Sequence, residues 1–166
     1  MNYEKIIFDD VANGKGMRTS LFVTGCRNCC DGCFNKQLWD FYAGKKFTKN
    51  EEDLIIANMD KYHSGISLLG GDPFELENVK DLLPFVRRFK EECPDKSIWC
   101  WTGYLFNNLK GSNKLVDELL TYIDILIDGP FISSERDVSL KWRGSKNQRL
   151  IQCKKSIKEN KIILLE

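Results

Sequence analysis

Short apolar runs alternate with amphipathic stretches along most of the chain, and this alternation limits the fold more than any other feature. Runs typical of buried strands cover residues 19–24, 66–69, 98–101 and 123–127. Helices are predicted from a capping box at Thr48 and Glu51 to about residue 62, over residues 78–92 with an imperfection at Pro84, and over residues 115–122. Alternation of this kind predicts an α/β fold with a mainly parallel sheet and right-handed crossovers.

Glycine and polar residues follow each predicted strand. Gly25-Cys26 follows the first, Gly70-Gly71-Asp72-Pro73 the second, Thr102-Gly103-Tyr104 the third and Asp128-Gly129-Pro130 the fourth. In sheets of this type, ligands bind beyond the carboxyl ends of the strands. A binding site is therefore expected where these four segments meet.

Size and charge narrow the possible functions. The chain has 166 residues, with no Pro/Ser linker or repeat, and we expect one domain over residues 1–166. Lys and Arg number 25 against 24 for Asp and Glu, so there is no excess charge to hold a nucleic acid or an anionic membrane. No apolar run reaches the roughly 20 residues of a spanning helix, and a cytoplasmic protein is expected.

Four of the seven cysteines lie within residues 26–33, which is typical of a metal site in a reducing compartment. Cys26, Cys30 and Cys33 have the spacing C-x3-C-x2-C. Three thiolates leave one iron of a four-iron cluster open for a substrate. Two alternatives remain from spacing alone: a zinc site on all four thiols, and a cluster on Cys26, Cys29 and Cys33. The only histidine, His63, lies beyond the next helix.

Several motifs in order resemble those of the radical S-adenosylmethionine enzymes, and within them the activating proteins of anaerobic (class III) ribonucleoside-triphosphate reductase. They are NGKGMRTSLFVTGC at residues 13–26, the cysteine loop, ISLLGGDP at 66–73, IWCWTGY at 98–104, LIDGPF at 126–131 and WRGSKNQR at 142–149. The resemblance covers nearly the whole chain. It implies a single-domain partial (open) β/α barrel of the radical S-adenosylmethionine type.

The resemblance also implies roles for individual residues. Cys26, Cys30 and Cys33 would bind one 4Fe-4S cluster, with Cys29 outside the pattern. The backbone of Gly70, Gly71 and Asp72 would receive the amino group of S-adenosylmethionine, although Gly-Gly-Asp-Pro is also an ordinary turn. Gly32, Cys33 and Phe34 would line the adenosine side, with Phe34 as a core residue the alternative. Thr102 would lie beside the nucleoside, or its strand end would only pack on the barrel wall.

The function implied by the resemblance is reductive cleavage of S-adenosylmethionine, followed by hydrogen abstraction from a glycine of the large reductase subunit. An external one-electron donor, flavodoxin-like or similar, would reduce the cluster. Alternatives are activation of another glycyl-radical enzyme of the formate-lyase type and a non-catalytic iron-sulfur or zinc module. The sequence assigns no role to Cys29, Cys93, Cys100 or Cys153, and it leaves Arg143 to Arg149 either facing the partner or solvated.

Overall fold

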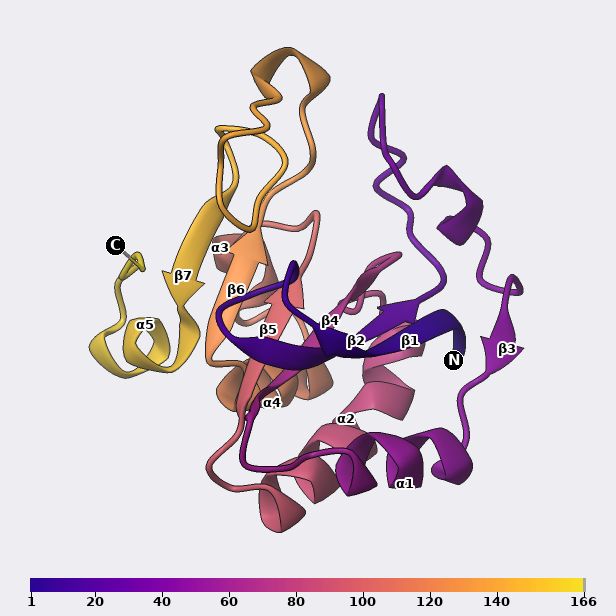
Figure 1. Cartoon of the computed structure of the whole chain (residues 1–166). Coiled ribbons are helices and arrows are strands. Elements are labelled where there is room, and N and C mark those ends of the chain that lie inside the picture. The colour runs from indigo at the N-terminus through magenta and orange to yellow at the C-terminus, as the bar shows by residue number, and fades with distance from the viewer. Residues whose placement is uncertain (166) are drawn as a thin grey trace.

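Seven strands form one open sheet in the order β3-β1-β2-β4-β5-β6-β7 (Figure 1). The computed structural model describes residues 1–165. The strands are β1 (Asn2–Asp10), β2 (Met17–Val23), β3 (Lys45–Lys46), β4 (His63–Gly70), β5 (Ser97–Trp101), β6 (Ile125–Asp128) and β7 (Arg149–Gln152). β2, β4, β5 and β6 run parallel, and β1, β3 and β7 pair antiparallel at the two sides. The expected mainly parallel sheet is confirmed.

One face of the sheet is covered by helices. A row of paired residues crosses it from β2 to β7, namely Leu21, Leu68, Cys100, Leu126 and Ile151, and each is at most 1% exposed. They join the main apolar core with residues of α1 (Lys49–Ala57), α2 (Leu76–Glu92), α3 (Phe106–Leu109), α4 (Lys114–Tyr122) and α5 (Cys153–Glu159). Because side chains alternate along a strand, the neighbouring residues point to the other face.

The other face carries aromatic residues and a buried arginine. Trp99 and Trp101 of β5 lie in two small apolar clusters there. Arg18 of β2 is 1% exposed and lies 5.4 Å from the Trp99 ring centroid. Its five N–H groups are all used, by Nε to Ser67 Oγ, by Nη1 to Lys15 O and Ser97 Oγ, and by Nη2 to Ile66 O and Ser97 O.

Three sequence expectations need correction. α1 ends at Ala57 instead of near residue 62, because Asp60 Oδ1 accepts from the backbone nitrogens of Tyr62 and His63 and forms a turn. The fourth parallel strand begins at Ile125, two residues later than expected. α2 contains Pro84 without interruption, and it is held by seven buried residues along one side.

The carboxyl ends of the four parallel strands meet at one edge, as expected. The segment after β2 and the segment after β6 rise on either side of that edge (Figure 1). His63 begins β4, so it lies at the opposite end of that strand from Gly70. None of the helices formed by residues 1–165 is both long and apolar enough to cross a bilayer.

Candidate functional site

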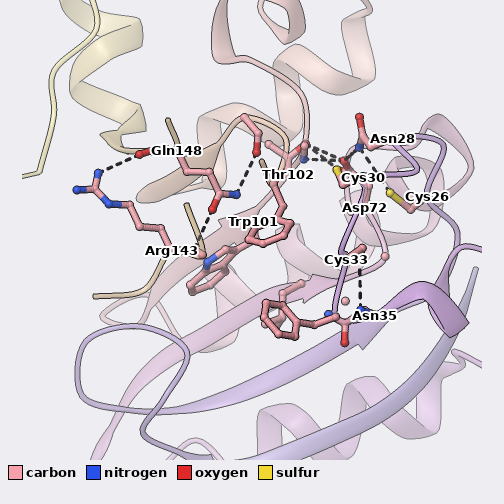
Figure 2. A pocket seen from close by; sticks show the side chains of 18 of the residues that line it. Cys26, Asn28, Cys30, Cys33, Asn35, Asp72, Trp101, Thr102, Arg143 and Gln148 are labelled. Atoms are coloured by element: carbon pink, nitrogen blue, oxygen red, sulfur yellow. Dashed lines mark hydrogen bonds between the residues drawn. The ribbon is translucent and has the colours of Figure 1, made fainter. Parts of the chain in front are cut away.

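A cavity of about 380 Å³ lies at the carboxyl edge of the sheet (Figure 2). This volume falls within the range of small-molecule sites. Its walls come from the cysteine loop, from the ends of β4 and β5, and from the segment that follows β6. Eight of the nine residues selected from the sequence line it: Cys26, Cys30, Cys33, Phe34, Gly70, Gly71, Asp72 and Thr102.

The three thiols of the C-x3-C-x2-C pattern lie on this cavity, and Cys29 does not line it. Cys29 is exposed, and its backbone has a positive φ of 46°, which turns the loop between Cys26 and Cys30. Within residues 1–165, no three His, Cys, Asp or Glu side chains gather as ligands of one metal ion.

An N–H group lies beside each of two of these thiols, Cys26 and Cys33. The backbone N–H of Asn35 donates to Cys33 Sγ at 3.4 Å, and Asn28 Nδ2 lies 3.5 Å from Cys26 Sγ. Burial raises the pKa of Cys26 to about 11 and also raises the pKa of Cys30. Because metals bind thiolates, loading a metal here releases protons, and the N–H donors stabilise the resulting negative charge.

The Gly70–Asp72 segment hydrogen-bonds to the chain that follows β2 and leads into a turn in which Glu75 N donates to Asp72 O at 3.1 Å. Gly71 N donates to Val23 O at 2.7 Å, and Asp72 N donates to Gly25 O at 2.8 Å. A Cβ atom on Gly71 would lie 2.6 Å from Gly25 O, so only glycine allows the two chains to approach this closely. The glycine backbone is thereby brought beside the cysteine loop.

Asp72 is fully buried at the centre of the strand ends. Its Oδ1 accepts from Phe74 N and Thr102 Oγ1, both at 2.9 Å, and its Oδ2 accepts from Asn28 Nδ2 at 2.7 Å and Gly103 N at 2.9 Å. Burial raises the pKa of Asp72 to about 6 in spite of these bonds. The Thr102 hydroxyl therefore donates its hydrogen to the Asp72 carboxylate. Thr102 nevertheless lines the cavity.

The remaining predicted residues differ in their placement. Phe34 is 65% exposed, so the alternative of a core residue is wrong; its ring centroid lies 5.7 Å from that of Phe131, and Arg136 lies over it. Gly32 is outside the cavity lining. It has a φ of 72°, and a Cβ atom there would lie 3.3 Å from the Cβ of Ser133. Gly32 thus shapes the turn that leads to Cys33.

The sequence did not predict most of the residues that form the cavity wall opposite the thiols. Trp101 Nε1 donates to Trp142 O at 2.7 Å, and Gln148 Nε2 donates to Gly129 O at 3.1 Å, which closes the segment after β6 against the strand ends. Arg143 lines the cavity. Arg149 forms an ion pair with the buried Asp128, so its role is internal. The WRGSKNQR motif marked this wall, but spacing alone did not predict these contacts.

Asn28 and Asn13 were also missed. Asn28 follows Cys26 by two residues and contacts both that thiol and Asp72. Asn13 reaches the cavity from the loop between β1 and β2, where Ser67 Oγ donates to its carbonyl at 2.6 Å. Its position at the start of a family motif was the only signal in the sequence.

Comparison with known proteins gives one consistent result. The family model described as a 4Fe-4S single cluster domain matches residues 12–151. Proteins named anaerobic ribonucleoside-triphosphate reductase-activating protein are similar over most of their length. The Pasteurella multocida protein is 46% identical over 151 residues, covering 89% of this chain and 95% of its own. The Escherichia coli K12 protein is 45% identical, covering 89% and 96%.

The similarity extends to a viral protein. The enterobacteria phage T4 protein of the same name is 40% identical over 153 residues, covering 90% of this chain and 93% of its own. Identity at this level over nearly complete chains, with three thiols on one cavity at the strand ends, establishes the relationship. The chain belongs to the family of anaerobic ribonucleoside-triphosphate reductase-activating proteins.

Proposed function

We propose that this protein activates anaerobic ribonucleoside-triphosphate reductase by generating a glycyl radical on its large subunit. The observation that carries the proposal is the joint placement of Cys26, Cys30 and Cys33 and the Gly70–Asp72 backbone on one cavity. The printed names of relatives at 45–46% identity and the 4Fe-4S family model support it.

The thiols fit a 4Fe-4S cluster with one open iron. Cys26, Cys30 and Cys33 would bind it, and the exposure of Cys29 outside the cavity supports this register over one using Cys29. The N–H groups at Cys26 and Cys33 fit thiolates and would be poorly used by neutral thiols. The open iron would leave room for S-adenosylmethionine inside the cavity.

S-adenosylmethionine would lie between the cysteine loop and the ends of β4 and β5. The backbone of Gly70, Gly71 and Asp72 would accept from its amino group, and Cys33, Phe34 and Thr102 would border the adenosine, with Gly32 holding the turn. Bound together, the cluster and S-adenosylmethionine would supply a 5′-deoxyadenosyl radical for hydrogen abstraction from the target glycine. The protein's residues orient the cofactor and shield it from water and stray C–H bonds.

The proposal also specifies the fold type, the partner proteins and the cellular location. The open sheet would be the partial β/α barrel of radical S-adenosylmethionine enzymes, in one domain over residues 1–166. The glycine-bearing loop of the large subunit would enter above the carboxyl edge of the sheet, and a flavodoxin-like protein or similar donor would deliver the electron. The formal charge of +1 argues against binding to nucleic acid or to an anionic membrane, and the protein would act in the cytoplasm.

The test begins with anaerobic reconstitution with iron and sulfide. Dithionite and S-adenosylmethionine should then yield 5′-deoxyadenosine, and adding the reductase should give a glycyl radical signal in electron paramagnetic resonance. 5′-Deoxyadenosine without that signal would point to another glycyl-radical enzyme. A metal centre that yields no 5′-deoxyadenosine would refute the proposal in favour of a non-catalytic module.

Cys29 and Cys30 provide a matched pair for the ligand assignment, because they are adjacent and only Cys30 lines the cavity. We expect Cys30→Ala to lose the cluster absorption and 5′-deoxyadenosine formation, while Cys29→Ala retains both. The opposite pattern would move the ligand set to Cys26, Cys29 and Cys33.

A further inference from the structure

The side-chain amide of Asn28 lies between the thiol of Cys26 and the carboxylate of Asp72 (Figure 2). Its Nδ2 donates to Asp72 Oδ2 at 2.7 Å and lies 3.5 Å from Cys26 Sγ. An amide nitrogen carries two hydrogens, so one can point to each partner. Through Nδ2, Asn28 therefore contacts Cys26 Sγ and also links the cysteine loop to Asp72 at the end of β4.

The surroundings fix which end of the amide faces the sulfur. A buried carboxylate accepts and cannot donate, so the NH₂ group and not the carbonyl oxygen of Asn28 must face Asp72. Asp72 is itself held by Phe74 N, Thr102 Oγ1 and Gly103 N, and it is 0% exposed. The carboxylate is thus a fixed anchor for the amide.

Gly103 leaves the space that this arrangement needs. A Cβ atom on Gly103 would lie 2.4 Å from Asn28 Nδ2 and 2.6 Å from its Cγ. The amide is therefore packed directly against the backbone at the end of β5. Asn28 lies after β2, and its amide contacts Asp72 after β4 and Gly103 after β5. These contacts hold one N–H of the amide toward Cys26.

We propose that Asn28 is a positioning residue that hydrogen-bonds the Cys26 thiolate in the metal-loaded protein and raises the reduction potential of the cluster. The inference rests on the proposed function, specifically on Cys26 as a ligand. An N–H bond to a ligand sulfur withdraws negative charge, which favours the reduced and more negative state of the cluster. Asp72 acts through Asn28 by holding the amide in place.

The experiment compares Asn28→Leu with Asn35→Ala in reconstituted protein. Leucine has nearly the shape of asparagine but no N–H. Asn35 lies two residues after Cys33, as Asn28 lies two residues after Cys26, but its donor to sulfur is the backbone N–H, which alanine retains. Asn35→Ala is therefore a control for loss of an amide side chain beside the cluster.

We expect Asn28→Leu to bind the same amount of iron with its reduction equilibrium about tenfold less favourable, a change of ~59 mV for one electron. Asn35→Ala should match the wild type. The potential is read from electron paramagnetic resonance signals during a redox titration without S-adenosylmethionine. Equal potentials for Asn28→Leu and wild type, at equal iron content, would overturn the proposal.

A second measurement needs no variant. In wild-type protein labelled with ¹⁵N only at asparagine side-chain amides, the reduced cluster should show a ¹⁵N coupling in pulsed electron paramagnetic resonance, and its absence would refute the hydrogen bond. Iron analysis of Cys26→Ala separates the two proposals. Retention of the cluster there would show that the ligand assignment itself fails, whereas its loss leaves Asn28 to be decided by the potential.

Discussion

Replacing Arg18 by lysine should strongly destabilise the fold, although the charge is retained. Arg18 is buried, and its five N–H groups each have a partner, including the carbonyls of Ile66 and Ser97 and the hydroxyls of Ser67 and Ser97. Lysine has a single nitrogen with three donors. Two of the five acceptors therefore lose their partner in the variant, whatever rotamer the lysine adopts.

The magnitude follows from those two acceptors. A hydrogen bond to a charged group contributes about 1.5–3 kcal/mol, so the loss of two should make Arg18→Lys less stable to unfolding by about 3–6 kcal/mol. For a chain of this size, each kcal/mol corresponds to about 2–4 °C in Tm. The substitution should also affect the cavity, because Arg18 donates to Ser67 Oγ and Ser67 Oγ donates to the carbonyl of Asn13, which lines the cavity.

Urea denaturation followed by circular dichroism measures the change, with Arg87→Lys as the control. Arg87 is on the surface, where its partner Glu118 is also exposed, and its substitution should stay within about 0.5 kcal/mol of wild type. An Arg18→Lys variant that falls in the same narrow range, with an unchanged m-value, would refute the view that all five hydrogen bonds matter.

Three further outcomes are expected. Thr48→Ala removes the capping box of α1 and should cost about 1 kcal/mol in urea denaturation; no change would mean that α1 is held by packing alone. Gly71→Ala places a Cβ against Gly25 O and should weaken S-adenosylmethionine binding by at least about tenfold in calorimetry, and unaltered affinity would remove this backbone from the site. In metal-free protein at pH 7, iodoacetamide should modify the exposed Cys29 first, as mass spectrometry can show. The buried Cys153, whose pKa burial raises to about 12, should react only above that pH or after unfolding, and early labelling of it would contradict the packing.

The parallel strands were predictable because each contains a short run rich in apolar residues that is followed by glycine or a polar residue. The antiparallel strands were not. β1 alternates between half-buried and exposed positions, and β7 has only four residues, so neither gives a run that stands out from a loop. α1 was predicted too long because the turn that ends it depends on the Asp60 side chain.

The site was predictable where its chemistry lies in one short segment. Cys26, Cys30 and Cys33 lie within eight residues, and the glycines after β4 mark a strand end. The partners of Asp72 could not be predicted, because Thr102 and Gly103 reach it from another strand and Asn28 from the cysteine loop. Such contacts depend on how strand ends are arranged in three dimensions, which no local pattern encodes.

The loop that carries the three cysteines has a consequence for handling the protein in air. In the part of the chain that the structure describes, none of these three side chains belongs to the apolar core; that core is built from the sheet and its helices. If the proposed cluster on these thiols is lost in air, we therefore expect the scaffold to stay folded. On the same reasoning, adding iron and sulfide should restore the cluster without a refolding step.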